Sequence, residues 1–159
     1  MKKFIQNKLK DQKGLTLIEL LAVIVILAII AAIAIPAIGN IIENSRYSAV
    51  KSDATNGISA ANIYFTENPD KTTVTATLLV SEGYLDSAGE LPVSGSATAT
   101  AAGAGVTLFK NVNPMSISTP AINFSGNKKI TFTNATVNGI NGDSKKGSEI
   151  TDTGYTISQ

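Results

Sequence analysis

The sequence contains no cysteine and no histidine among its 159 residues. Without cysteine the chain can form no disulfide and has no thiol for catalysis or metal binding. Without histidine it lacks the commonest metal ligand and the commonest general base at neutral pH. Because nucleophile–base pairs, metal-ligand spacings and phosphate-binding loops are missing as well, we expect no catalytic residue, no metal site and no cofactor.

Charge is sparse along most of the chain and concentrated at its start. The total is +1, and the first 14 residues hold five lysines against Asp11, which gives them +4 and leaves −3 for residues 15–159. A negative net charge on residues 15–159 argues against nucleic-acid binding. The length suits one modest domain.

An uncharged apolar run follows this basic start. Leu20 to Ile38 reads LLAVIVILAIIAAIAIPAI, and about 20 such residues are enough for a helix to span a membrane. Because the lysines precede the run, the positive-inside rule predicts a cytoplasmic N-terminus and places residues 40–159 outside.

Two simple interpretations of this run leave features unexplained. A permanent membrane anchor explains neither Glu19 nor Pro36. A secretory signal peptide explains Ala32-Ile33-Ala34 as a small-residue cleavage site, but the apolar stretch is long for such a peptide and carries a carboxylate near its start.

A third interpretation starts from Glu19, whose carboxylate costs about 2.5 to 3.5 kcal/mol inside a membrane and needs a partner. The preceding basic residue, Lys13, lies before Gly14. Cleavage after Gly14 would give Leu15 a new α-amino group, which could pair with Glu19 of its own chain or of a neighbouring chain. Pairing with a neighbouring chain would join two subunits.

The residues Lys13-Gly14-Leu15-Thr16-Leu17-Ile18-Glu19-Leu20-Leu21, followed by the apolar run and Pro36, resemble the signal of type IV prepilins. The resemblance covers residues 1 to about 40, and it departs from the family in having Leu15 where phenylalanine is usual. It implies that a prepilin peptidase cuts between Gly14 and Leu15 and methylates the new amine. It further implies that Glu19 pairs with the Leu15 amine of a neighbouring copy during assembly.

The resemblance implies a leader at residues 1–14, a membrane-spanning and later filament-core segment at 15–39, and an extracellular head at 40–159. Its partners would be other copies, the prepilin peptidase, the pilus assembly machinery and the inner membrane before assembly. The surface filament would serve adhesion, twitching motility, biofilm formation or aggregation. A pseudopilin of a type II secretion system and a minor pilin remain open, as does a membrane-tethered binding module or enzyme.

The helix is expected to continue beyond the membrane. Apolar residues at positions 47, 50, 54, 58, 61 and 65 recur at helical spacing, and Pro69 predicts an end near Thr66. Pro36 and Gly39 predict a kink or local melting between Ala32 and Gly39.

The remaining residues favour an α+β fold, in which the long helix packs against a small antiparallel sheet of three or four strands, as in type IV pilins. A short helix is predicted at 74–82, closed by Gly83, and a loop at 94–105. Strands are predicted at 106–109, 121–124, 130–133 and 155–157, with a hairpin turn at 125–128 and further turns at 138–139 and 141–142. Asp143, Glu149 and Asp152 are expected to be solvated turn residues rather than calcium ligands. The missing disulfide suggests the Gram-positive type of pilin.

Overall fold

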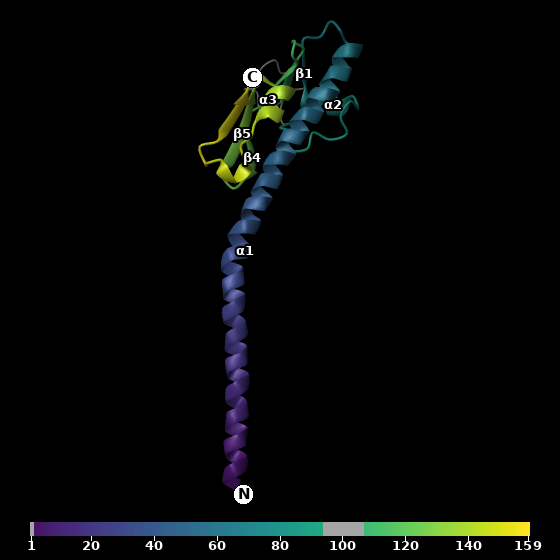
Figure 1. Cartoon of the computed structure of the whole chain (residues 1–159). Helices are drawn as coiled ribbons and strands as arrows, with labels where there is room; N and C mark the ends of the chain where they lie inside the picture. Colours follow the sequence, from purple (N-terminus) through teal and green to yellow (C-terminus); the bar gives the residue numbers. More distant parts are fainter. Residues whose placement is uncertain (1, 94–106) are drawn as a thin grey trace. The chain divides into compact units, whose positions relative to one another are not determined.

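The structure is a computed structural model that describes the backbone of residues 2–93 and 107–159 and the side chains of residues 17–93 and 107–159. Its elements in chain order are α1 (Lys2–Glu67), β1 (Thr73–Thr75), α2 (Ala76–Ser81), β2 (Leu108–Lys110), β3 (Ser116–Ser118), β4 (Ile122–Ser125), β5 (Lys128–Thr133), β6 (Ala135–Thr136), α3 (Val137–Gly142), η2 (Gly147–Glu149) and β7 (Tyr155–Ser158). Residues 1–40 and 41–159 form two separate compact units. A long N-terminal helix packs against an antiparallel sheet (Figure 1), and the predicted α+β class is confirmed.

Helix α1 is continuous from Lys2 to Glu67 and contains Pro36. Local melting around Pro36 is therefore absent in the single chain, because a proline removes one backbone hydrogen bond while unbroken helix on both sides holds the neighbouring turns. The helix ends one residue after the predicted position. There the backbone amide and the side-chain amide of Asn68 both donate to the carbonyl of Tyr64, at 2.9 and 3.0 Å.

The predicted apolar stripe of α1 forms one side of the core. Tyr47, Val50, Ala54, Ile58, Ala61 and Phe65 are all at most 5% exposed. They pack with buried residues of the strands, among them Phe109, Ile117 and Phe132. The confirmed stripe shows that residues 47–65 hold the head to the helix by burying apolar side chains.

The first sheet has the order β1-β2-β3-β6, and every neighbouring pair is antiparallel. The helix predicted at 74–82 starts too early, because Val74 pairs with Phe109 in the sheet and α2 begins only at Ala76. The Thr75 side chain caps α2 by accepting a hydrogen bond from the Leu78 amide at 3.2 Å. The predicted C-terminal glycine is confirmed, since Gly83 follows the C-cap residue Glu82 and has a φ of +80°.

The second sheet has the order β4-β5-β7. Its β4–β5 hairpin confirms the turn predicted at 125–128, where Gly126 has a φ of +54°. Strand β7, however, runs parallel to β5, so the prediction of a purely antiparallel arrangement is wrong here. The long connection through β6, α3 and η2 makes a parallel return sterically feasible.

The turns predicted at 138–139 and 141–142 are wrong, because both asparagine–glycine pairs lie inside α3. Thr136 caps this helix by accepting a hydrogen bond from the Gly139 amide at 3.2 Å. A suitable N-cap and the burial of Ile140 outweigh the turn preference of the two pairs.

A close approach between α1 and β2 generates the first prediction. A Cβ added at Gly57 would lie 2.6 Å from Cζ of the Phe109 ring. Alanine normally stabilises a helix interior by about 1 kcal/mol relative to glycine, whereas overpacking a core costs about 1 to 3 kcal/mol. We therefore expect Gly57→Ala to lower the free energy of unfolding, measured by tyrosine fluorescence of the full-length chain in detergent during denaturant unfolding.

The exposed neighbour Asn56 provides the matched control. Asn56→Ala gains helix propensity without a new contact and should leave stability equal or slightly higher. An equal gain in both variants would show that the Phe109 ring moves aside at no cost.

Candidate assembly surface

Residues 17–42 of α1 carry a long apolar surface that is exposed in the described part of the chain. The exposed fraction of their large apolar side chains ranges from 47% at Ile42 to 70% at Ile33. Within the described residues, one helix is long and apolar enough to cross a membrane, and it includes this segment. An uncovered apolar surface of this size requires lipid or another protein against it.

Glu19 lies on this surface and is exposed. The sequence holds no lysine or arginine between Lys13 and Arg46, so the segment has no cation of its own for this carboxylate. Leu15 lies four residues before Glu19 in the same helix, a separation that puts two residues on one face, one turn apart. Gly14 and Leu15 lie within α1, and their side-chain surroundings fall outside the described residues.

Pro36 and Gly39 are exposed in the same segment. A Cβ added at Gly39 would meet nothing within 4 Å. The absence of a side chain at Gly39 is therefore not required by packing within this chain, and it leaves room beside the helix.

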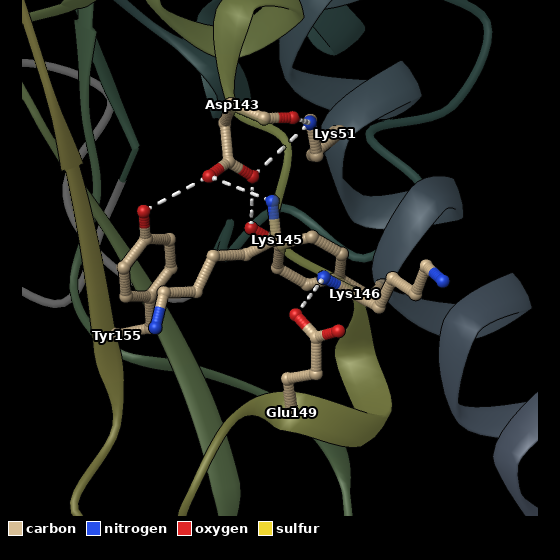
Figure 2. Close-up of polar contacts among 7 residues, drawn as sticks. Lys51, Asp143, Lys145, Lys146, Glu149 and Tyr155 are labelled. Atoms are coloured by element: carbon tan, nitrogen blue, oxygen red, sulfur yellow. Dashed lines mark hydrogen bonds and ion pairs between the residues drawn. The ribbon is translucent and has the colours of Figure 1, made fainter.

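Beyond this segment, a polar cluster joins the C-terminal region to α1, and we call it the Asp143 clasp (Tyr47, Lys51, Asp143 and Tyr155). Figure 2 shows the Asp143 carboxylate directed toward Tyr155 and Lys51. Its Oδ2 accepts hydrogen bonds from the Tyr47 hydroxyl at 2.5 Å and from Lys51 Nζ at 3.2 Å. Its Oδ1 accepts one from the Tyr155 hydroxyl at 2.9 Å. Lys51 Nζ also donates to the Asp143 carbonyl at 2.9 Å, so three hydrogen bonds join α1 to Asp143.

The clasp keeps Asp143 ionised and both tyrosines protonated. Burial acts to raise the pKa of Asp143, but hydrogen bonds from Tyr47, Tyr155 and Lys51 and the Lys51 charge hold it below its ordinary value. Burial and the bond to Asp143 raise the pKa of Tyr47, and the bond to Asp143 raises the pKa of Tyr155. The tyrosines therefore act as donors to a carboxylate, a structural arrangement that offers no activated nucleophile.

A second cluster, the Glu43 clasp (Glu43, Asn44, Lys128 and Ser148), lies nearer the start of the head. Lys128 Nζ donates to Glu43 Oε2 at 2.8 Å and to the Ser148 carbonyl at 3.3 Å. The Ser148 amide donates to Asn44 Oδ1 at 2.9 Å. A Cβ at Gly147 would lie 2.5 Å from the Glu43 carbonyl, so η2 sits directly on the helix. Together the clasps hold the C-terminal region to α1 in a chain without disulfides.

The sequence did not reveal the clasps. Asp143 was expected to be a solvated turn residue, but its side chain is only 5% exposed. Glu149 and Asp152 are exposed, as expected, and the described residues contain no group of three acidic side chains that could hold a metal ion. The one available signal was Tyr47 and Lys51 at a spacing of four, which places two donors side by side on the helix.

Residues 9–35 match the model of the prokaryotic N-terminal methylation motif. This motif is typical of type IV prepilins, and the matched range includes Gly14, Leu15 and Glu19 but ends before Pro36 and Gly39. It indicates a structural subunit rather than an enzyme, and it implies processing by a prepilin peptidase and assembly into pili. No curated protein and no solved structure matches the chain.

The Asp143 clasp generates a prediction about stability and pH. In Asp143→Asn the amide keeps one acceptor and turns an NH₂ group toward other donors, so we expect a loss of about 2 kcal/mol in the free energy of unfolding at neutral pH. The pKa of Asp143 is lower in the folded than in the unfolded chain. Its contribution is therefore fully present above the unfolded pKa and is lost as the pH falls through the folded value.

The stabilities of wild type and Asp143→Asn should consequently converge in acid, measured by denaturant unfolding across a pH series. Asp152→Asn serves as the control, because Asp152 is exposed; it should follow wild type at every pH. A deficit in Asp143→Asn that stayed constant down to strongly acidic pH would contradict an ionised Asp143 as its cause.

Proposed function

We propose that this chain is the precursor of a type IV pilin, a structural subunit that is exported, cleaved and polymerised into a surface filament. The observation that carries the proposal is the position of the methylation motif, whose residues 9–35 include most of the exposed apolar helix surface at 17–42. A plain anchor would need the apolar surface but not the motif.

Processing removes residues 1–14. Hydrolysis of the peptide bond between Gly14 and Leu15 leaves an α-amino group on Leu15, which is then N-methylated and keeps a positive charge. The five lysines of the leader support an N-terminus in the cytoplasm before cleavage. Cleavage thus creates a cation at the edge of a segment that has none.

Assembly transfers residues 15–39 from the membrane to the filament core, while residues 40–159 form the head. Lipid covers apolar side chains as well as another helix does, so burying residues 17–42 does not by itself favour the filament. A charge pair between Glu19 and the Leu15 amine of a neighbouring copy favours the filament over the membrane, because it gives a carboxylate that is costly in lipid its partner. The open space beside Gly39 supports close helix packing.

The two clasps support a pilin head that stays closed without a disulfide, which we propose is of the Gram-positive type. Glu43 and Tyr47 lie at the start of the head, close along the chain to the filament-core segment. Holding the C-terminal region at these residues fixes the head to the same helix that packs in the filament.

The processing step makes a direct prediction about the mature chain. Intact mass and N-terminal sequencing of protein from its native cells should give a chain that begins at N-methylated Leu15. Gly14→Phe should leave the full precursor in the membrane fraction, because a bulky residue occupies the cleavage position. A chain that begins at Ile35 or Met1 would contradict the proposal, since it would indicate a signal peptide or an anchor.

The assembly step predicts the effect of removing the carboxylate. Glu19→Ala and Glu19→Gln should be cleaved normally but yield at least tenfold less sheared filament, because the Leu15 amine loses its partner. Thr16→Ala is the matched control in the same segment and should assemble normally. A normal filament yield from both Glu19 variants would eliminate the charge pair as the basis of assembly.

A further inference from the structure

Charge is divided unevenly within the head. Residues 43–51 and 125–155, which we call the basal part, hold six cations against four carboxylates, a net charge of +2. The rest of residues 40–159 holds Lys71 and Lys110 against six carboxylates, a net charge of −4. The cations of the basal part are Arg46, Lys51, Lys128, Lys129, Lys145 and Lys146, and its carboxylates are Glu43, Asp143, Glu149 and Asp152.

Contacts on Glu43 gather two segments of the basal part at the start of the head. Lys128 Nζ, at the β4–β5 hairpin, donates to Glu43 Oε2 at 2.8 Å. A Cβ added at Gly147 would lie 2.5 Å from the Glu43 carbonyl, so Lys146, the preceding residue, is held close to the same turn of α1. The hairpin and η2 therefore both lie against the helix at Glu43.

The second sheet brings further cations to this end of the head. Lys129 follows Lys128 in β5, and Ile130 pairs with Tyr155, the first residue of β7. Because β5 and β7 are parallel, both strands begin at the end that contacts Glu43. Lys145 Nζ lies 5.4 Å from the centroid of the Tyr155 ring. The cations of residues 128–146 thus belong to one end of the head.

Most of these cations are available to a partner outside the chain. Among the residues whose side chains the structure describes, ion pairs engage Lys51 and Lys128 only. The remaining four cations of the basal part have no carboxylate partner there, and all four are exposed: Arg46, Lys129, Lys145 and Lys146. The basal part therefore presents exposed positive charge on a head whose remaining surface is acidic.

The covalent link to the apolar run limits how far Glu43 can lie from a membrane. Glu43 lies five positions after Ile38, which is about 8 Å along a continuous helix, whatever the angle between the two units of the chain. The headgroup layer is about 5 to 8 Å thick on each side of the hydrocarbon core. If residues 20–38 span the core, Glu43 and the cations held against it reach the headgroups. Ile41 and Ile42, 66% and 47% exposed, lie between and suit this boundary.

We propose that the basal part of the head binds anionic phospholipid headgroups at the outer face of the membrane while the chain is embedded there. The inference rests on the proposed function, because it needs residues 15–39 in a bilayer and residues 40–159 outside it. Lipid phosphates supply the anions that the four exposed cations lack within the chain. The same surface repels the acidic rest of the head, so both parts favour a head whose basal part faces the lipid.

Lipid preference around the head tests this binding. Asn127→Cys introduces a single thiol at an exposed position of the hairpin beside Lys128, and this thiol carries a donor dye. The full-length chain is reconstituted in phosphatidylcholine with about one third phosphatidylglycerol and a trace of either lipid with an acceptor dye on its acyl chain. Transfer to labelled phosphatidylglycerol should exceed transfer to labelled phosphatidylcholine about twofold, and the two should become equal at about 1 M salt. Equal transfer at low salt would overturn the inference.

Charge variants separate the head from the leader, whose five lysines also attract anionic lipid. Lys129→Gln with Lys146→Gln removes two charges from the basal part, and Lys71→Gln with Lys110→Gln removes two from the rest of the head as the matched control. Both pairs keep the leader. The basal pair should bring the two transfers close to equality, whereas the control pair should keep the wild-type preference. A basal pair that kept the full preference would show that the head does not cause it, and the inference would be wrong.

The two proposals fail in different ways. If the native chain begins at Ile35, no apolar helix holds the head at a membrane, and both fail. If it begins at N-methylated Leu15 and Glu19→Ala lowers filament yield, but phosphatidylglycerol is not preferred around Asn127→Cys, only the lipid contact is refuted.

Discussion

One carboxylate on an otherwise apolar helix surface constrains everything else about this chain. Glu19 belongs to the exposed segment 17–42, which contains no lysine or arginine to pair with it. A carboxylate that is costly in the membrane needs a cation as its partner. The methylation motif around it indicates how a cation could be produced at the right place, by exposing a new amine rather than by encoding a lysine.

The same helix also packs against the head. From Tyr47 to Phe65 it buries one stripe under the head, and the head closes on it with polar contacts instead of covalent ones. The Asp143 clasp and the Glu43 clasp both bind residues separated by more than 80 positions in the sequence. Their energy depends on protonation state, since each is organised around a carboxylate whose pKa is held low. The integrity of the head is therefore tied to pH in a way that a disulfide would not be.

Local patterns predicted much of this architecture, and long-range contacts account for the rest. The stripe of α1, its end near Pro69 and the β4–β5 hairpin were predictable because spacing and turn residues act within a few positions. Val74 was misassigned to a helix because its strand partner, Phe109, lies 35 positions further on. The parallel pairing of β7 and the burial of Asp143 depend in the same way on distant segments. Gly14, Leu15 and Glu19 were predicted from the cost of an unpaired carboxylate in a membrane and from the resemblance to prepilins, and their roles are proposals.

The parallel pairing of β5 with β7 also determines when the head can be completed. Ile130 to Thr133 pair with Tyr155 to Ser158, the last strand of the chain, and Tyr155 also closes the Asp143 clasp. During synthesis and export, the β4–β5 hairpin can form early, but one edge of β5 stays open until residues 155–158 emerge. Pairing of β7 is thus the step that completes this sheet, and a chain that stopped before Tyr155 would leave an unpaired edge of β5 free to bind its neighbours.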